Sequence, residues 1–151
     1  MKHGCTWLIC ITLGVLSVRA QEPSRPVKVD RLCGYLQQEK QYPEKRNPNS
    51  TQYGYASVGQ APVRLYPREG TEACCSQMPP TREVLTRKNG KFNFRQLPAG
   101  NYWLGALIEN REYKMQIEYK PTKENQSDCE EHLYTLDKNR NFVLLAIITV
   151  T

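Results

Sequence analysis

The sequence contains few of the residues and none of the compact motifs that mark the common active sites. Its only histidines are His3 and His132. It has no Gly-x-Ser-x-Gly elbow, no phosphate-binding Gly-rich loop and no His-Glu-x-x-His. Near His132 stand Asp128, Glu130 and Glu131, but consecutive acidic residues in a polar stretch are more typical of solvated charge than of a base or a metal site. We therefore expect no catalysis, no metal and no cofactor.

Long apolar runs are also scarce. The run from Trp7 to Val18 is about a dozen residues, too short to cross a bilayer, which takes roughly 20. Lys2 precedes it, and Val18-Arg19-Ala20 offers small side chains where a signal peptidase reads. No cysteine follows where a lipid anchor would attach. Residues 1–20 are therefore predicted to be a signal peptide and residues 21–151 one exported domain, periplasmic or extracellular, with no membrane insertion after cleavage.

Charge of one sign is not concentrated anywhere in the exported part. Removing Lys2 and Arg19 leaves 19 basic residues against 15 acidic ones. The basic residues alternate with Asp and Glu along the chain, whereas a nucleic acid or an anionic membrane needs them clustered. We expect a solvated surface, no nucleic-acid binding, and a protein that is monomeric or weakly associating.

Four cysteines remain once Cys5 and Cys10 leave with the signal peptide: Cys33, Cys74, Cys75 and Cys129. An even number in an exported chain predicts two disulfides. Zinc is the rival, but the chain lacks Cys-x-x-Cys and closely spaced histidines. Neighbours such as Cys74 and Cys75 are held too close to pair with each other. Each should reach a distant partner, with Cys33 joined to either one and Cys129 to the other, and both connectivities stay open.

The stretch from Lys88 to Glu109 organises the predicted fold. Asn89-Gly90 predicts a type I′ hairpin turn, because both residues tolerate positive φ. Phe92 and Phe94 then alternate with polar residues, as in a half-buried strand. The turn Leu97-Pro98-Ala99-Gly100 leads into a second strand, Tyr102 to Ile108.

Further strands follow from the same patterns. Glu83–Arg87 and Tyr113–Tyr119 are predicted strands, and His132–Asp137 is a short strand or a helical turn. Phe142–Val150 is unbroken and apolar, which predicts a central strand, with an edge awaiting another chain as the alternative. The predicted core comprises Val63, Leu65, Phe92, Phe94, Tyr102, Leu104, Ala106 and Ile117.

The spacing Asn-Gly-Lys-Phe-x-Phe followed by Leu-Pro-Ala-Gly-x-Tyr resembles the carboxypeptidase regulatory-like domains of the transthyretin-like group, which includes the Cna B-type modules. Val29 to Tyr35 and Ala61 to Tyr66 are similar to the family's first and second strands. The likeness covers roughly Val27 to Tyr119. It implies an all-β, antiparallel Greek-key sandwich of about seven strands, prealbumin-like. The family's fold carries many functions, so the resemblance implies no particular activity. Some Cna-like relatives form an intramolecular isopeptide crosslink that needs a buried acid. This chain has Phe94 at the matching position, so we expect no such crosslink.

Two polar insertions interrupt the predicted strands. Gln37–Gly59, which cannot form a core, carries Tyr42, Tyr53 and Tyr55 and the glycosylation acceptor Asn49-Ser50-Thr51. Asn125-Gln126-Ser127 is a second such acceptor, silent like the first in a typical bacterium. Arg68–Pro80 carries Cys74-Cys75 and is expected to be held by disulfides.

Binding sites on rigid sandwiches tend to lie in loops, so the tyrosines of Gln37–Gly59 are candidate ligand contacts. So is Trp103, which should point outward if Tyr102 and Leu104 point inward. The alternative is that these aromatic side chains lie against the sandwich. We expect a non-catalytic module that binds glycan or protein outside the cell, or else a structural or accessory module of a larger envelope assembly.

Overall fold

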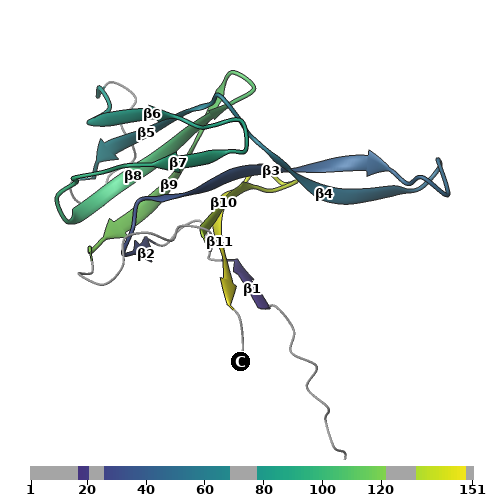
Figure 1. The fold of residues 1–151 in the computed structure, drawn as a ribbon, viewed down its shortest axis with the longest axis horizontal. Coiled ribbons are helices and arrows are strands. Elements are labelled where there is room, and N and C mark those ends of the chain that lie inside the picture. Colours follow the sequence, from purple (N-terminus) through teal and green to yellow (C-terminus); the bar gives the residue numbers. More distant parts are fainter. Residues whose placement is uncertain (1–16, 21–25, 69–77, 122–131, 149–151) are drawn as a thin grey trace, which may run out of the picture.

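The computed structural model describes residues 17–20, 26–68, 78–121 and 132–148, and in these residues the chain is all-β with no helix. Eleven strands form two sheets (Figure 1). Their bounds are β1 Ser17–Ala20, β2 Val27–Val29, β3 Cys33–Pro43, β4 Thr51–Ser57, β5 Pro62–Pro67, β6 Arg82–Leu85, β7 Lys91–Asn93, β8 Gly100–Ile108, β9 Arg111–Tyr119, β10 His132–Leu136 and β11 Phe142–Ile148.

Both sheets are mixed. Sheet A has the order β1-β11-β10-β3-β4, with β7 also paired to β3, and sheet B has the order β2-β9-β8-β5-β6. Most pairs are antiparallel, but β10 runs parallel to β3 and β2 runs parallel to β9. The all-β prediction is confirmed. A purely antiparallel sandwich of about seven strands is not confirmed, because short strands such as β1, β2 and β7 extend the sheets and two of the pairs are parallel.

The core lies where the two sheets face each other. All eight residues predicted for it are buried, with exposures of 8% or less. They are joined there by Leu36, Tyr134 and Leu136 of sheet A, each with no exposed surface. The rings of Phe92 and Tyr134 lie 5.2 Å apart between centroids. The alternation of apolar and polar residues therefore identified this part of the core correctly.

The segment predicted as one first strand, Val29 to Tyr35, is two strands in different sheets. Val29 ends β2 in sheet B, and Cys33 begins β3 in sheet A. The chain crosses between the sheets through Asp30–Leu32, where Leu32 is buried and its carbonyl accepts a hydrogen bond from the Phe94 amide (2.8 Å). Val29 and Cys33 are both buried and four residues apart, as they would be on one face of a single strand, so the pattern contained no mark of the crossing.

The predicted type I′ hairpin at Asn89-Gly90 is wrong. Gly90 has a φ of 84°, but Asn89 is not among the residues with positive φ, and the turn hydrogen bond runs from the Gly90 amide to the Arg87 carbonyl (2.8 Å). The flanking strands β6 and β7 belong to different sheets, so the turn carries the chain between sheets. Glycine is required here, because a Cβ on Gly90 would lie 2.4 Å from the Leu36 carbonyl oxygen.

Positive φ at two consecutive turn residues, which a type I′ turn requires, occurs instead at Glu109 (52°) and Asn110 (64°). These residues form the two-residue connection between β8 and β9, whose register brings Ile108 opposite Arg111. Strand β9 therefore begins at Arg111, two residues before the predicted strand Tyr113–Tyr119. Pairing along the full length of both strands stabilises this unusual glutamate conformation.

The C-terminal strands settle two open alternatives. His132–Leu136 is a strand, not a helical turn. The apolar strand β11 lies between β10 and β1, so it is central in the whole chain. Its outer neighbour β1 consists of the last four residues of the predicted signal peptide.

Cys33 is disulfide-bonded. The other three cysteines of the predicted exported domain, Cys74, Cys75 and Cys129, lie outside the described residues, as do most of Arg68–Pro80 and the acidic residues before His132. The two possible connectivities therefore stay predictions.

Candidate functional site: the β3–β4 hairpin

The polar segment predicted as a loop without regular structure, Gln37–Gly59, is instead a long hairpin. Strands β3 and β4 pair from Gln37 with Ser57 to Pro43 with Thr51, and they extend together well beyond sheet B (Figure 1). The interpretation was wrong because a polar composition was taken to exclude strands. In fact the hairpin projects past the core, so neither face needs apolar side chains, while the backbone ladder and residues with high β propensity such as Thr and Tyr hold the strands.

A tight turn closes the tip of the hairpin. The Ser50 amide donates to the Asn47 carbonyl (2.9 Å), and the Asn49 amide donates to the Asn47 side chain (3.2 Å). The Ser50 hydroxyl donates to the Glu44 carboxylate. Asn49, the predicted glycosylation acceptor, is exposed at this tip.

Two of the predicted contact residues, Tyr53 and Tyr55, share one face of the hairpin. Side chains two residues apart on a strand point the same way, about 7 Å apart, and Tyr53 and Tyr55 are 51% and 58% exposed. Directly across on β3, Gln41 pairs with Tyr53 and Glu39 pairs with Tyr55. These four side chains therefore form one surface, which we call the tyrosine face.

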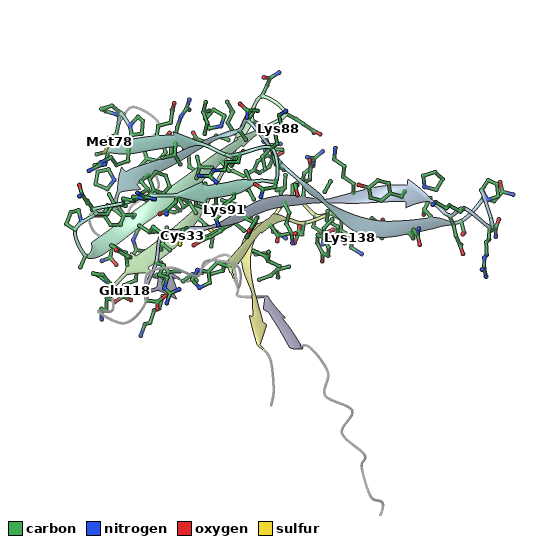
Figure 2. The ribbon with its side chains drawn as sticks, viewed as in Figure 1. Cys33, Met78, Lys88, Lys91, Glu118 and Lys138 are labelled. Carbon is green, nitrogen blue, oxygen red and sulfur yellow. The ribbon has the colours of Figure 1, made fainter. Side chains whose placement is uncertain are left out.

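A cation from another part of the chain completes the tyrosine face. The Lys138 ammonium nitrogen lies 4.8 Å from the centroid of the Tyr53 ring, and the Lys138 amide donates to the Glu39 carboxylate (2.9 Å). Lys138 belongs to the turn between β10 and β11 and lies where the hairpin leaves the sandwich (Figure 2). A lysine over an aromatic ring at an exposed site contributes roughly 0.5–1 kcal/mol, so this contact orients Tyr53.

A shallow groove of about 420 Å³ runs beside Tyr53. Its lining includes Gln41, Lys138, Arg140 and Glu109. The Arg140 guanidinium lies 3.7 Å from the Glu109 carboxylate and 3.4 Å from the Tyr113 hydroxyl. The groove therefore places hydrogen-bond donors and acceptors of both charges next to an exposed aromatic ring, which is the combination that polar ligands with one flat face require.

Tyr42, also predicted as a ligand contact, is on the opposite face of the same hairpin. It pairs with Gln52 and lies across the backbone of Gly54, so that a Cβ on Gly54 would stand 3.2 Å from the Tyr42 ring. Tyr42 is 39% exposed. It does not contribute to the tyrosine face, although it has the same side chain and belongs to the same hairpin.

Trp103, the fourth predicted contact, lies far along the chain and in the other sheet. It is half-buried, whereas its neighbours Tyr102 and Leu104 are in the core, so its side chain points to the outer face of sheet B. On that face Trp103 lies between two cross-strand neighbours, Tyr66 of β5 on one side and Gln116 of β9 on the other. The structure therefore does not bring Trp103 together with the hairpin tyrosines.

The surroundings of Trp103 form a connected polar network. The Tyr66 hydroxyl donates to Glu112 (2.7 Å), Arg64 pairs with Glu83 (2.6 Å), and Arg68 donates to Gln116 (2.6 Å). Burial raises the pKa of the Tyr66 hydroxyl, and its hydrogen bond to Glu112 raises it further. The Tyr66 hydroxyl and the Glu112 and Glu83 carboxylates already have partners within this network, so this face is better suited to holding sheet B together than to binding a ligand.

Sequence reasoning missed Glu39, Gln41 and Lys138. Period-two alternation would have placed Glu39 and Gln41 beside the tyrosines had Gln37–Gly59 been interpreted as a hairpin. Nothing local indicates Lys138, because its position depends on the parallel pairing of β10 with β3.

Within the described ranges, no three His, Cys, Asp or Glu side chains are grouped so that they could hold a metal ion. In that same part of the chain, no helix has the length and apolar character needed to span a membrane. No protein-family model, no curated protein and no solved structure matches the sequence or the fold of this chain. What defines its class is therefore its own architecture, a two-sheet β protein with a tyrosine-bearing hairpin.

Proposed function

We propose that this chain is an exported, non-catalytic β-sandwich module that binds a glycan outside the cell through the tyrosine face of the β3–β4 hairpin. The observation that carries the proposal is the pair of exposed rings, Tyr53 and Tyr55, on one face of a projecting hairpin. Monomeric proteins rarely expose large apolar side chains together without a binding role. The groove lined by Gln41, Lys138, Arg140 and Glu109 adds the polar partners that sugar hydroxyls need.

The fold belongs to the same proposal. We infer a variant of the prealbumin-like Greek-key sandwich of the carboxypeptidase regulatory-like group. In support, Phe92, Phe94 and Tyr102 of the two resembling motifs are all buried. The Tyr102 hydroxyl also donates to the Pro98 carbonyl (2.7 Å), which closes the Leu-Pro-Ala-Gly turn. Export rests on the sequence of residues 1–20.

The test is capture of glycans by residues 21–151 on a glycan array, followed by affinity measurement with Tyr53→Ala and Tyr55→Ala. Each substitution should weaken capture by about 1 kcal/mol or more, roughly fivefold, and leave the melting temperature nearly unchanged. Tyr42→Ala is the matched control, since it removes the same side chain from the other face of the same hairpin.

Other results would redirect the proposal. Equal loss with Tyr42→Ala would show that the two faces are not distinguished by the ligand. Loss with Trp103→Ala alone would move the site to sheet B. If the tyrosine substitutions lower the melting temperature and leave capture intact, the second candidate, a structural or accessory module of an envelope assembly, takes precedence.

A further inference from the structure

We propose that removal of the signal peptide opens the outer edge of β11, and that a second copy of this chain occupies that edge by antiparallel β11–β11 pairing. The inference rests on the export part of the proposed function, but not on glycan binding. It concerns a surface on the side of sheet A opposite to the β3–β4 hairpin, because β11 and β4 lie toward opposite ends of the strand order.

The strand that covers β11 in the whole chain is the one that cleavage removes. β1 pairs antiparallel with β11, from Ser17 opposite Ile148 to Ala20 opposite Leu145. The two strands lie side by side and run away from the body of the sandwich (Figure 1). Cleavage after Ala20, where the sequence predicts it, takes away all of β1 and turns β11 from an inner strand into an edge.

The edge left behind has none of the usual protection against pairing. Protected edge strands carry charges, prolines or bulges, or are very short. β11 is seven residues long, Phe-Val-Leu-Leu-Ala-Ile-Ile, without a charged residue, a proline or a glycine. By contrast, the edge strand β6 is four residues with Arg82 and Glu83, and the edge strand β4 contains Gly54 and polar residues throughout.

A second copy of β11 fits this edge in direction and in length. The β1 pairing shows that the edge accepts an antiparallel strand, and two copies of one strand related by a two-fold axis are antiparallel by symmetry. With Leu145 on the axis, Phe142 would face Ile148 of the other copy, so all seven residues are matched, where β1 covers only four. Such an interface closes on itself and stops at a dimer.

The experiment compares three chains by analytical ultracentrifugation across a concentration series. The chain of residues 21–151 should sediment as a dimer. The chain of residues 17–151, in which β1 occupies the edge, should be monomeric at the same concentrations. Val18→Pro with Arg19→Pro in residues 17–151 should restore the dimer, because prolines remove the amides with which β1 pairs. Val18 and Arg19 do not belong to the hydrophobic core, so all three chains should fold and unfold cooperatively on heating, and the melting temperature should rise with concentration only in the two chains that dimerise.

Three results would overturn the inference. One is a monomer for residues 21–151 up to the solubility limit, and another is the same mass for all three chains. The third is a series of masses beyond the dimer, which would mean open pairing of β11 with another edge. Amide hydrogen exchange of residues 145–148 provides an independent measurement: protection should rise with concentration in residues 21–151 and in the double-proline chain, but not in residues 17–151 with an unaltered β1. Failure of glycan capture would leave these masses unchanged, so the two proposals fail separately.

Discussion

The sandwich body and the β3–β4 hairpin are both built from paired strands, but only the body buries side chains. In β8 five of nine residues are buried, whereas in β4 none is. The body is therefore stabilised mainly by removal of apolar surface from water, and the hairpin by its backbone ladder and cross-strand contacts. Substitutions should therefore be tolerated better in the hairpin than in the sandwich body. The hairpin can carry exposed tyrosines because the body alone maintains the fold.

The largest expected effect comes from the body. Phe92→Ala removes a ring that is 3% exposed and contacts the rings of Phe94 and Tyr134. We expect a loss of about 3–5 kcal/mol in the free energy of unfolding. Denaturant titration measures it, with Tyr53→Ala in the hairpin as the control that should change stability by less than about 0.5 kcal/mol. Similar losses in both variants would contradict the comparison.

The second prediction concerns the outer face of sheet B. Gly105 leaves room for Glu112 to cross β8 and accept the Tyr66 hydrogen bond, since a Cβ on Gly105 would lie 2.5 Å from the Glu112 carboxylate. Gly105→Ala should displace this carboxylate from a part-buried partner and cost about 1–3 kcal/mol. In the background of Glu112→Ala the same substitution should cost much less, and a double-mutant cycle by thermal unfolding measures the difference. An additive cycle would mean that the cost arises elsewhere.

The third prediction is an alkaline weakening of the body. Burial raises the pKa of the Tyr134 hydroxyl above its ordinary value of 10.0, and nearby Asp30 adds to the shift. The folded state therefore keeps the proton above pH 10 while the unfolded state releases it, so this stabilisation is complete below pH 10 and is lost as pH rises further. The loss should approach about 1.4 kcal/mol per pH unit.

Tyr134→Phe is the control for the alkaline prediction. This fully buried hydroxyl has no hydrogen-bond partner among the described residues, so at neutral pH its removal should leave stability unchanged or slightly higher. Between pH 10 and 11.5 the variant should lose less stability than the parent chain in urea titrations. Parallel pH curves for the two proteins would contradict the assignment.

The smallest expected effect on stability, with a clear effect on binding, belongs to the hairpin. Lys138→Met removes the ammonium group over Tyr53 but keeps much of the side chain's length. We expect a change of less than about 1 kcal/mol in unfolding and a two- to threefold loss of glycan capture through a less ordered ring. Lys88→Met, at an exposed position that does not line the groove, is the matched control in the same array assay.

The sequence predicts the sandwich body far better than the β3–β4 hairpin, and individual residues show the physical reasons. Phe92 and Phe94 alternate with polar residues because one face of the strand meets the core, and that alternation can be recognised from the local sequence. The crossing between the two sheets at Gly90 cannot be predicted from the sequence, because the same turn residues would also suit a hairpin within one sheet. The tyrosine face could be predicted only as far as its aromatic residues, since Lys138 reaches it through long-range pairing.

The parallel pairing of β10 with β3 also determines when sheet A can be completed. A hydrogen bond between Gln37 and Thr135 joins residues 98 positions apart, and β11 can add to the sheet only through β10. Contacts between residues so distant in sequence form slowly, since a long loop must close first. We therefore expect the C-terminal hairpin to dock last, so that sheet A stays incomplete until both β10 and β11 have been synthesised.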